Sequence, residues 1–111
     1  MVKLYIPERA DIVWLDFSPQ AGQEQAGRRP ALVLSPSSYN KNGMALVCPI
    51  TSKVKGYPFE VTIKTDKING VVLSDHIKNH DWRARKLHFI SKANFDVLQA
   101  VSKNIFALLI K

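Results

Sequence analysis

The residues best suited to chemistry stand just before an apolar run in the first third of the chain: Glu24, Arg28 and Arg29. The run, residues 30–34, is rich in branched side chains and ends at a serine and a proline, which is typical of a buried strand bounded by turns. The polar residues before it are therefore predicted to form a loop at the edge of a rigid sheet. Because Arg29 precedes a proline, its backbone is expected to be extended. Its guanidinium can bind a phosphate through two hydrogen bonds.

Two later segments, residues 53–58 and 78–88, combine basic groups with aromatic rings. Such a surface can follow the backbone of a single-stranded nucleic acid and stack one of its bases. For Trp82 another interpretation stays open, in which the ring fills the interior of the fold or a contact between subunits. The residues of these segments predicted to bind nucleic acid are Lys53, Lys55, Tyr57, Lys78, Trp82, Arg83 and Arg85.

The charge of the chain is unevenly distributed. The formal net charge is +7, of which residues 1–52 carry +1 and residues 53–111 carry +6. This surplus predicts a polyanionic partner, most often nucleic acid, although a basic protein without such a partner would show the same charge. The single cysteine, Cys48, excludes an internal disulfide and fits a reducing cytoplasm. Because it lies in an apolar segment with no evident base beside it, we expect a buried hydrophobic residue rather than a nucleophile.

The length and the hydropathy pattern predict a single domain over residues 1–111. A chain of this size buries a core only narrowly, so a partner subunit would add stability. No apolar run approaches the length of a membrane span, and the N-terminal residues lack the apolar core of a signal peptide.

The elements that must position these residues are short strands followed by one helix. A proline cannot donate to a ladder, so Pro49 predicts that its strand lies at an edge or is bulged. Ser91 is predicted to cap a helix over residues 92–110, whose apolar side chains recur every three or four residues and should pack against the sheet. The predicted strands are residues 11–17, 31–34, 45–51, 59–64, 71–73 and 87–90, and the side chains of the packing face are Phe95, Leu98, Val101, Ile105 and Leu108. Together they indicate a small, bent antiparallel sheet or barrel with the helix over one end.

The three histidines allow two further hypotheses. His76, His80 and His88 could supply a pair of imidazoles for ribonuclease-type catalysis, and the spacing of His76 and His80 suits a metal site on a helix. Neither hypothesis is favoured, because residues 70–85 are predicted to be largely loop, which does not preform a metal site. His76 remains a candidate contact to nucleic acid.

Five stretches of the chain resemble, in the same order, the MazF/PemK/Kid toxins of bacterial toxin–antitoxin systems: residues 11–17, 24–36, 48–52, 55–61 and 70–75. The first hundred residues follow the MazF pattern nearly without gaps. The resemblance implies an SH3-like antiparallel β-barrel with a C-terminal helix, acting as a homodimer in the cytoplasm. It further implies metal- and cofactor-independent cleavage of single-stranded mRNA at a short sequence, leaving 2′,3′-cyclic phosphate and 5′-hydroxyl ends. The implied partner is an antitoxin with an acidic, flexible tail, which would also connect the toxin to DNA.

The resemblance assigns roles to individual residues. Metal-free cleavage needs an acceptor for the 2′-OH proton and stabilisation of a dianionic phosphorus. Arg29 suits stabilisation, Thr51 matches a hydroxyl of the family's active site, and Glu24 either accepts the proton or holds Arg29. Asp75 matches an aspartate that some relatives pair with an arginine two residues earlier. Here that position is Leu73, so we expect Asp75 to bind RNA instead. The residues outside the basic segments that are predicted to bind RNA are Arg28, Ser52, Asp75 and His76.

Two other functions stay open on the sequence alone. An SH3-like domain of this kind could bind nucleic acid or a peptide without cutting it, and a related toxin branch uses the same fold to poison gyrase. Simple binding has less need of Arg29, Thr51 and Glu24 together.

Overall fold

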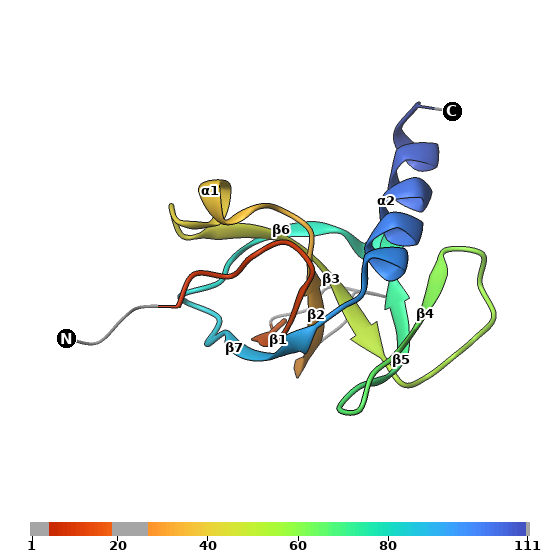
Figure 1. Cartoon of the computed structure of the whole chain (residues 1–111), viewed down its shortest axis with the longest axis horizontal. Coiled ribbons are helices and arrows are strands. Elements are labelled where there is room, and N and C mark those ends of the chain that lie inside the picture. The colour runs from red at the N-terminus through yellow and green to blue at the C-terminus, as the bar shows by residue number, and fades with distance from the viewer. Residues whose placement is uncertain (1–4, 19–26, 111) are drawn as a thin grey trace.

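The computed structural model describes residues 5–18 and 27–110 and consists of a bent antiparallel sheet with a C-terminal helix (Figure 1). The strands follow the order β4-β5-β3-β2-β1-β7, and β6 also pairs with β3. The mainly antiparallel β architecture with a terminal helix is thus confirmed. The elements are β1 Asp11–Asp16, β2 Arg28–Val33, α1 Ser37–Asn40, β3 Met44–Thr51, β4 Glu60–Lys64, β5 Asn69–Leu73, the 3₁₀ turn η1 Ser74–His76, β6 Lys78–Asp81, β7 His88–Lys92 and α2 Phe95–Ile110.

The third strand, β3, joins the two parts of the sheet. Residues 44–47 pair with β6, whereas Ile50 and Thr51 pair with β5, and β2 runs along the other side. Pro49 therefore lies in an interior strand, and the prediction of an edge position is wrong. It is accommodated because it falls between the two stretches that pair with β6 and β5, opposite the place where η1 interrupts those two strands.

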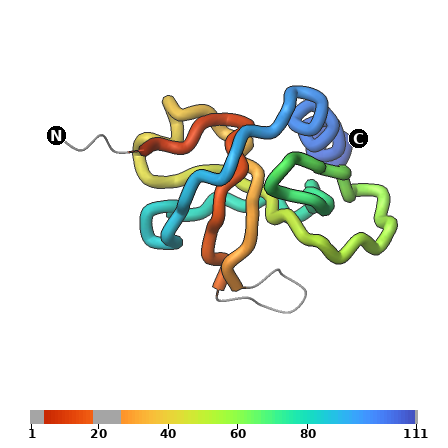
Figure 2. Tube along the Cα trace, turned by 60° about the horizontal axis from the view of Figure 1, so that its bottom comes forward, coloured from red at the N-terminus to blue at the C-terminus, as the bar shows by residue number. Residues whose placement is uncertain are grey.

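Adjacent residues of the central strands point into two separate cores. Ile12 and Leu32 belong to a core on the side of α2, whereas their neighbours Val13 and Val33 belong to a second core on the opposite face. Side chains alternate across a strand, so an unbroken apolar run is needed where both faces are covered. Figure 2 shows how the remaining chain wraps around these central strands.

The terminal helix begins later than the sequence indicated. Ser91 lies in β7, opposite Ile12, and the cap is Asn94, whose Oδ1 accepts the N–H of Val97 at 3.1 Å. Val97, Val101 and Ile105 pack against the core on the α2 side.

The predicted packing face of the helix is confirmed at Val101 and Ile105 and is wrong at its two ends. Phe95 and Leu108 are 68% and 50% exposed. Figure 1 shows the C-terminal end of α2 projecting beyond the sheet, where Leu108 lacks a packing surface.

Two predicted loops are ordered elements. β2 starts at Arg28, so Arg28 and Arg29 pair with Asp16 and Leu15 instead of standing in a loop. Residues 70–85, predicted to be largely loop apart from the strand 71–73, also contain η1 and the strand β6. In both places the polar composition predicted a loop where the chain forms a strand. Hydrogen bonds to neighbouring strands stabilise the strand despite this local composition.

Candidate active site

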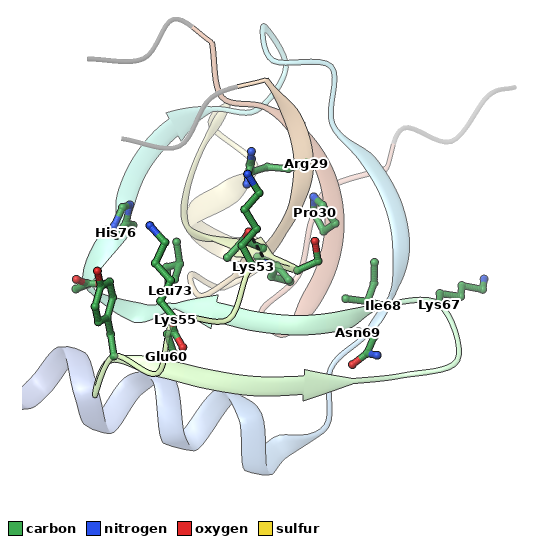
Figure 3. Close-up of a pocket in the computed structure, with 15 residues that line it drawn as sticks. Arg29, Pro30, Lys53, Lys55, Glu60, Lys67, Ile68, Asn69, Leu73 and His76 are labelled. Carbon is green, nitrogen blue, oxygen red and sulfur yellow. Dashed lines mark hydrogen bonds between the residues drawn. The ribbon is translucent and has the colours of Figure 1, made fainter. Parts of the chain in front are cut away.

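A cavity of about 960 Å³ lies where β2, β3 and β5 meet the segment that joins β3 to β4 (Figure 3). Figures 1 and 2 show this segment running out from the end of β3, on the side of the molecule away from α1. Eight residues predicted from the sequence line the cavity: Arg29, Thr51, Ser52, Lys53, Lys55, Tyr57, Asp75 and His76. Residues separated by almost half the chain therefore meet at one site.

Arg29 enters the site from the rigid part of the sheet. It lies in β2 opposite Leu15, is half-buried, and points with Lys53 into the same opening (Figure 3). A guanidinium fixed on a strand is a better anion site than one on a free loop, because less side-chain freedom is lost on binding.

Thr51 ends β3 on the floor of the same cavity. Its Oγ1 accepts the backbone N–H of Lys53 at 3.2 Å, which leaves its own hydroxyl proton to be donated elsewhere. Gly70 of β5 lies directly against the Thr51 backbone. The hydroxyl is therefore positioned from two sides, by its own turn and by the neighbouring strand.

Asp75 and His76 reach the cavity from η1, which is anchored from behind. The Ser74 hydroxyl donates to the carbonyl oxygen of Phe59, and Asn104 of α2 donates to the Ser74 Oγ at 3.2 Å. Leu73, at the position where some relatives were expected to have an arginine, lines the cavity as well.

Cys48 lies behind η1 and is fully buried, as expected from the sequence. Burial, with a smaller contribution from the charge of Asp75, raises the pKa of its thiol to about 12. A thiol that stays protonated is a poor nucleophile, so Cys48 has no part in the chemistry of the site.

The charge of the lining favours an anionic ligand. Four permanently basic side chains, Arg29, Lys53, Lys55 and Lys67, face two carboxylates, Glu60 and Asp75. Glu60, Lys67 and Asn69 also line the cavity, although no sequence motif marked them as site residues. The alternation of β4 placed Glu60 on the polar face of its strand, but only the folded chain brings that face to the cavity.

Five predicted nucleic-acid contacts lie away from the cavity. Arg28 is exposed on β2, where its Nη2 lies 2.9 Å from the Nδ1 of His88. Arg85 donates to the carbonyl oxygens of Asp16 and Ser18 at 3.0 and 2.8 Å, so its guanidinium closes the end of β1. The residues concerned are Arg28, Lys78, Trp82, Arg83 and Arg85.

Trp82 is the clearest correction among them. The side chain is only 7% exposed, and its Nε1 donates to the carbonyl oxygen of Asn40 at 2.8 Å. Arg83 lies over the indole at 5.0 Å and donates to the carbonyl oxygen of Lys41. A buried ring with its N–H satisfied has no face for a base, so the structure supports the alternative in which Trp82 fills the interior.

The histidines do not gather into one centre. His76 belongs to η1 at the cavity, whereas His80 is buried in β6. The rings of His80 and Phe17 are nearly perpendicular, with 5.1 Å between their centroids. Within residues 5–18 and 27–110 no cluster of three or more metal-ligating side chains occurs. Glu24, the predicted proton acceptor, lies outside the described residues.

Comparison with known proteins identifies the group to which this fold and site belong. Residues 8–109 match the family described as the PemK-like, MazF-like toxin of type II toxin–antitoxin systems. The chain belongs to this family. The endoribonuclease toxin MazF of Escherichia coli K12 is 52% identical over 86 residues, which cover 77% of this chain and 78% of that protein.

Solved structures of the family agree with the fold described above. MazF of Deinococcus radiodurans superimposes with a TM-score of 0.91 at 50% identity, covering 95% of this chain and 97% of that one. A MazE–MazF complex from the same organism gives a TM-score of 0.84 at 44% identity, covering 96% and 97%. Among the described residues of this family member, no helix has the length and apolarity needed to cross a membrane.

Proposed function

We propose that this family member is an endoribonuclease that cleaves single-stranded mRNA at a short sequence without a metal ion. The observation that carries the proposal is the meeting of Arg29 and Thr51 in one predominantly basic cavity. The name of the E. coli relative, an endoribonuclease toxin, supports the same activity.

The proposed reaction uses the RNA's own 2′-OH as nucleophile. The 2′ oxygen gives up its proton and bonds to phosphorus, and the bond from phosphorus to the 5′ oxygen breaks. The leaving 5′ oxygen takes up a proton from solvent, so the products carry a 2′,3′-cyclic phosphate and a 5′-hydroxyl. Arg29 binds two non-bridging oxygens and neutralises the charge that accumulates on them, while the Thr51 hydroxyl donates to one of them. Glu24 keeps the two roles proposed for it from the sequence, to accept the 2′-OH proton or to hold Arg29.

The remaining lining residues bind the RNA on either side of the cleaved phosphate. Lys53 and Lys55 neutralise neighbouring phosphates, and the ring of Tyr57, which is 61% exposed, can stack on a base. Ser52, Asp75 and His76 offer hydrogen bonds to sugar or base edges. Cleavage of mRNA would stop translation in the cytoplasm.

A cognate antitoxin is the second proposed partner. The MazE–MazF complexes of the D. radiodurans relative support it. An acidic, flexible tail would be attracted by the same basic lining and would block RNA by occupying the cavity, with an affinity that falls as salt rises. The antitoxin would also connect the protein to DNA.

The proposed functional unit is a homodimer. The end of α2 exposes an apolar cluster that a second copy could cover. Its members are Phe106, Leu108, Leu109 and Ile110.

The deciding experiment incubates the purified protein with single-stranded RNA in the presence of EDTA. Fragments with cyclic-phosphate and 5′-hydroxyl ends are the expected result. Intact RNA that stays bound would replace the proposal with a non-cleaving binding module. Intact RNA together with stalled gyrase–DNA complexes would replace it with a gyrase poison.

A further inference from the structure

Glu60 is a carboxylate inside a cavity that is otherwise suited to phosphate. It opens β4 and lines the cavity beside Lys53, Lys55 and Tyr57. A negative charge at this place should repel RNA, so its presence needs a physical reason.

The reason lies in the backbone of the preceding turn. One oxygen of the Glu60 carboxylate accepts the N–H of Lys55 at 3.1 Å, and the other accepts the N–H of Gly56 at 3.0 Å. Two successive N–H groups that converge on one anion form a backbone nest. Gly56 has a φ of +80°, a conformation that glycine adopts readily and that completes the nest.

Among the described residues, few other contacts hold the segment from Lys53 to Tyr57. Val54 and Tyr57 are 64% and 61% exposed, so apolar packing does not anchor the segment. Within residues 5–18 and 27–110, its other backbone hydrogen bonds lie at the two ends, from Lys53 N–H to Thr51 Oγ1 and from Glu60 N–H to the Tyr57 carbonyl oxygen. The Glu60 carboxylate therefore anchors the middle of the segment through its hydrogen bonds to Lys55 and Gly56.

We propose that Glu60 is a positioning residue that folds the segment 53–57 into a basic wall of the cavity and so sets the affinity for RNA. This inference rests on the proposed function. The carboxylate contributes through geometry: its oxygens are directed at the loop backbone, and the order that they impose on Lys53, Lys55 and Tyr57 outweighs the repulsion of phosphate by their charge. Because the same wall contacts bases, Glu60 also affects which sequence is chosen.

Repulsion by the Glu60 charge and positioning of the wall by Glu60 change the affinity for RNA in opposite directions, which makes the proposal testable. If Glu60 acted only as a charge, removing it would strengthen RNA binding. If it positions the wall, removing it weakens binding, because flexible lysines must be ordered when RNA binds. Glu60→Gln keeps an acceptor oxygen for the nest and removes the charge, and Asp66→Ala removes one negative charge from an exposed turn outside the cavity.

The experiment measures binding of a mixed-sequence, single-stranded RNA oligonucleotide that is 2′-O-methylated throughout, so that no nucleophile is available for cleavage. Glu60→Ala should bind about tenfold more weakly than the native chain, a loss of the size expected when two lysine side chains must be ordered on binding. Glu60→Gln should stay within about threefold of native binding, and Asp66→Ala should bind at least as tightly as the native chain. With cleavable RNA, Glu60→Ala should raise KM and leave kcat nearly unchanged, since Arg29 and Thr51 are intact.

Amide hydrogen exchange tests the geometry without RNA. In Glu60→Ala the amides of Lys55 and Gly56 should exchange faster, while those of β3 keep their protection. Tighter RNA binding by Glu60→Ala, or unchanged exchange at both amides, overturns the inference. Failure of the native chain to bind or cut RNA overturns the proposed function instead, and it removes the RNA part of the inference even if the exchange result holds.

Discussion

Gly70 and Thr51 approach so closely that no side chain fits between their strands. A Cβ added to Gly70 would lie 3.0 Å from the carbonyl carbon of Thr51 and would collide with its carbonyl oxygen. Both neighbours are backbone atoms, so the contact cannot be relieved by a change of rotamer. The proposed catalytic hydroxyl is thus placed partly by the absence of a side chain on the adjacent strand.

Gly70→Ala should therefore impair cleavage more than its effect on stability accounts for. The added methyl group must displace Thr51 and the start of the following segment relative to Arg29, and a displacement of about 1 Å at a reacting group can lower the rate about a hundredfold. Single-turnover cleavage and thermal unfolding should be measured together.

The matched control for Gly70→Ala is Ile63→Val. Ile63 pairs with Gly70 from β4 and is buried, so its truncation should lower stability by about 1 kcal/mol without pressing on Thr51. Native cleavage rates in Gly70→Ala at temperatures where it is folded would show that the close approach has no part in the activity.

Arg29→Ala should lower the cleavage rate by about a hundredfold or more, the usual loss when an electrostatic donor to a transition state is removed. Arg29→Lys should recover only part of it, because an ammonium cannot bind two oxygens in the same fork. The oligomeric state should not change.

The neighbouring arginine supplies the control for that experiment. Arg28 carries the same charge one residue away but contacts His88 outside the cavity. Arg28→Ala should cleave at close to the native rate. If both alanine variants lost activity equally, general positive charge and not the placement of Arg29 would explain the effect.

Thr51→Val should lower the rate by about tenfold to a hundredfold, since it keeps the shape of the side chain and removes the donor. Thr51→Ser should retain most of the activity, because a serine hydroxyl can accept from Lys53 and still donate. Rates under single-turnover conditions separate this effect from product release. A fully active Thr51→Val would exclude the hydroxyl from the reaction.

Cys48 should make the protein less stable in alkali. The thiol has an ordinary pKa of 9.0, which burial raises to about 12 in the folded protein. Between these values the unfolded chain loses a proton that the folded chain keeps, so the free energy of unfolding should fall as pH rises from about 9 towards 12.

Comparison with Cys48→Ala isolates the contribution of Cys48 to the pH dependence, because lysines and tyrosines titrate equally in both proteins. Urea unfolding at several pH values should give a shallower decline for Cys48→Ala. Native protein should also resist iodoacetamide at pH 8 and react after unfolding. If the free energy of unfolding fell equally steeply with pH in both proteins, burial would not perturb the pKa of the thiol.

The end of α2 should mediate self-association. Leu109 is 75% exposed and belongs to the apolar cluster, and Leu109→Lys should dissociate the dimer without changing the fold of each subunit. Ser102→Lys adds the same charge to an exposed position of the same helix and should leave association intact. Light scattering at micromolar concentration gives the mass of each variant, and a monomeric native protein would contradict the prediction.

The position of Trp82 illustrates where local patterns fail. Its basic neighbours suggested a surface that stacks bases, yet the ring lies in the interior because β6 turns this segment back against α1 and β1. The same holds for Glu60, whose role arises from its distance to two amide groups and not from its neighbours in the sequence. Sequence spacing cannot reveal contacts that depend on the curvature of a sheet.

The sequence by itself determined the family, the antiparallel β architecture with a terminal helix, the burial of Cys48 and eight residues of the cavity. These follow from hydrophobic alternation, turn residues and motifs, all of which act over a few positions. Only the tertiary structure decided that β3 divides its pairing at Pro49, that Arg29 projects from a strand, and that Gly70 and Glu60 shape the wall around Thr51. Such contacts depend on how distant strands meet, and that meeting is fixed by packing and register across the whole sheet.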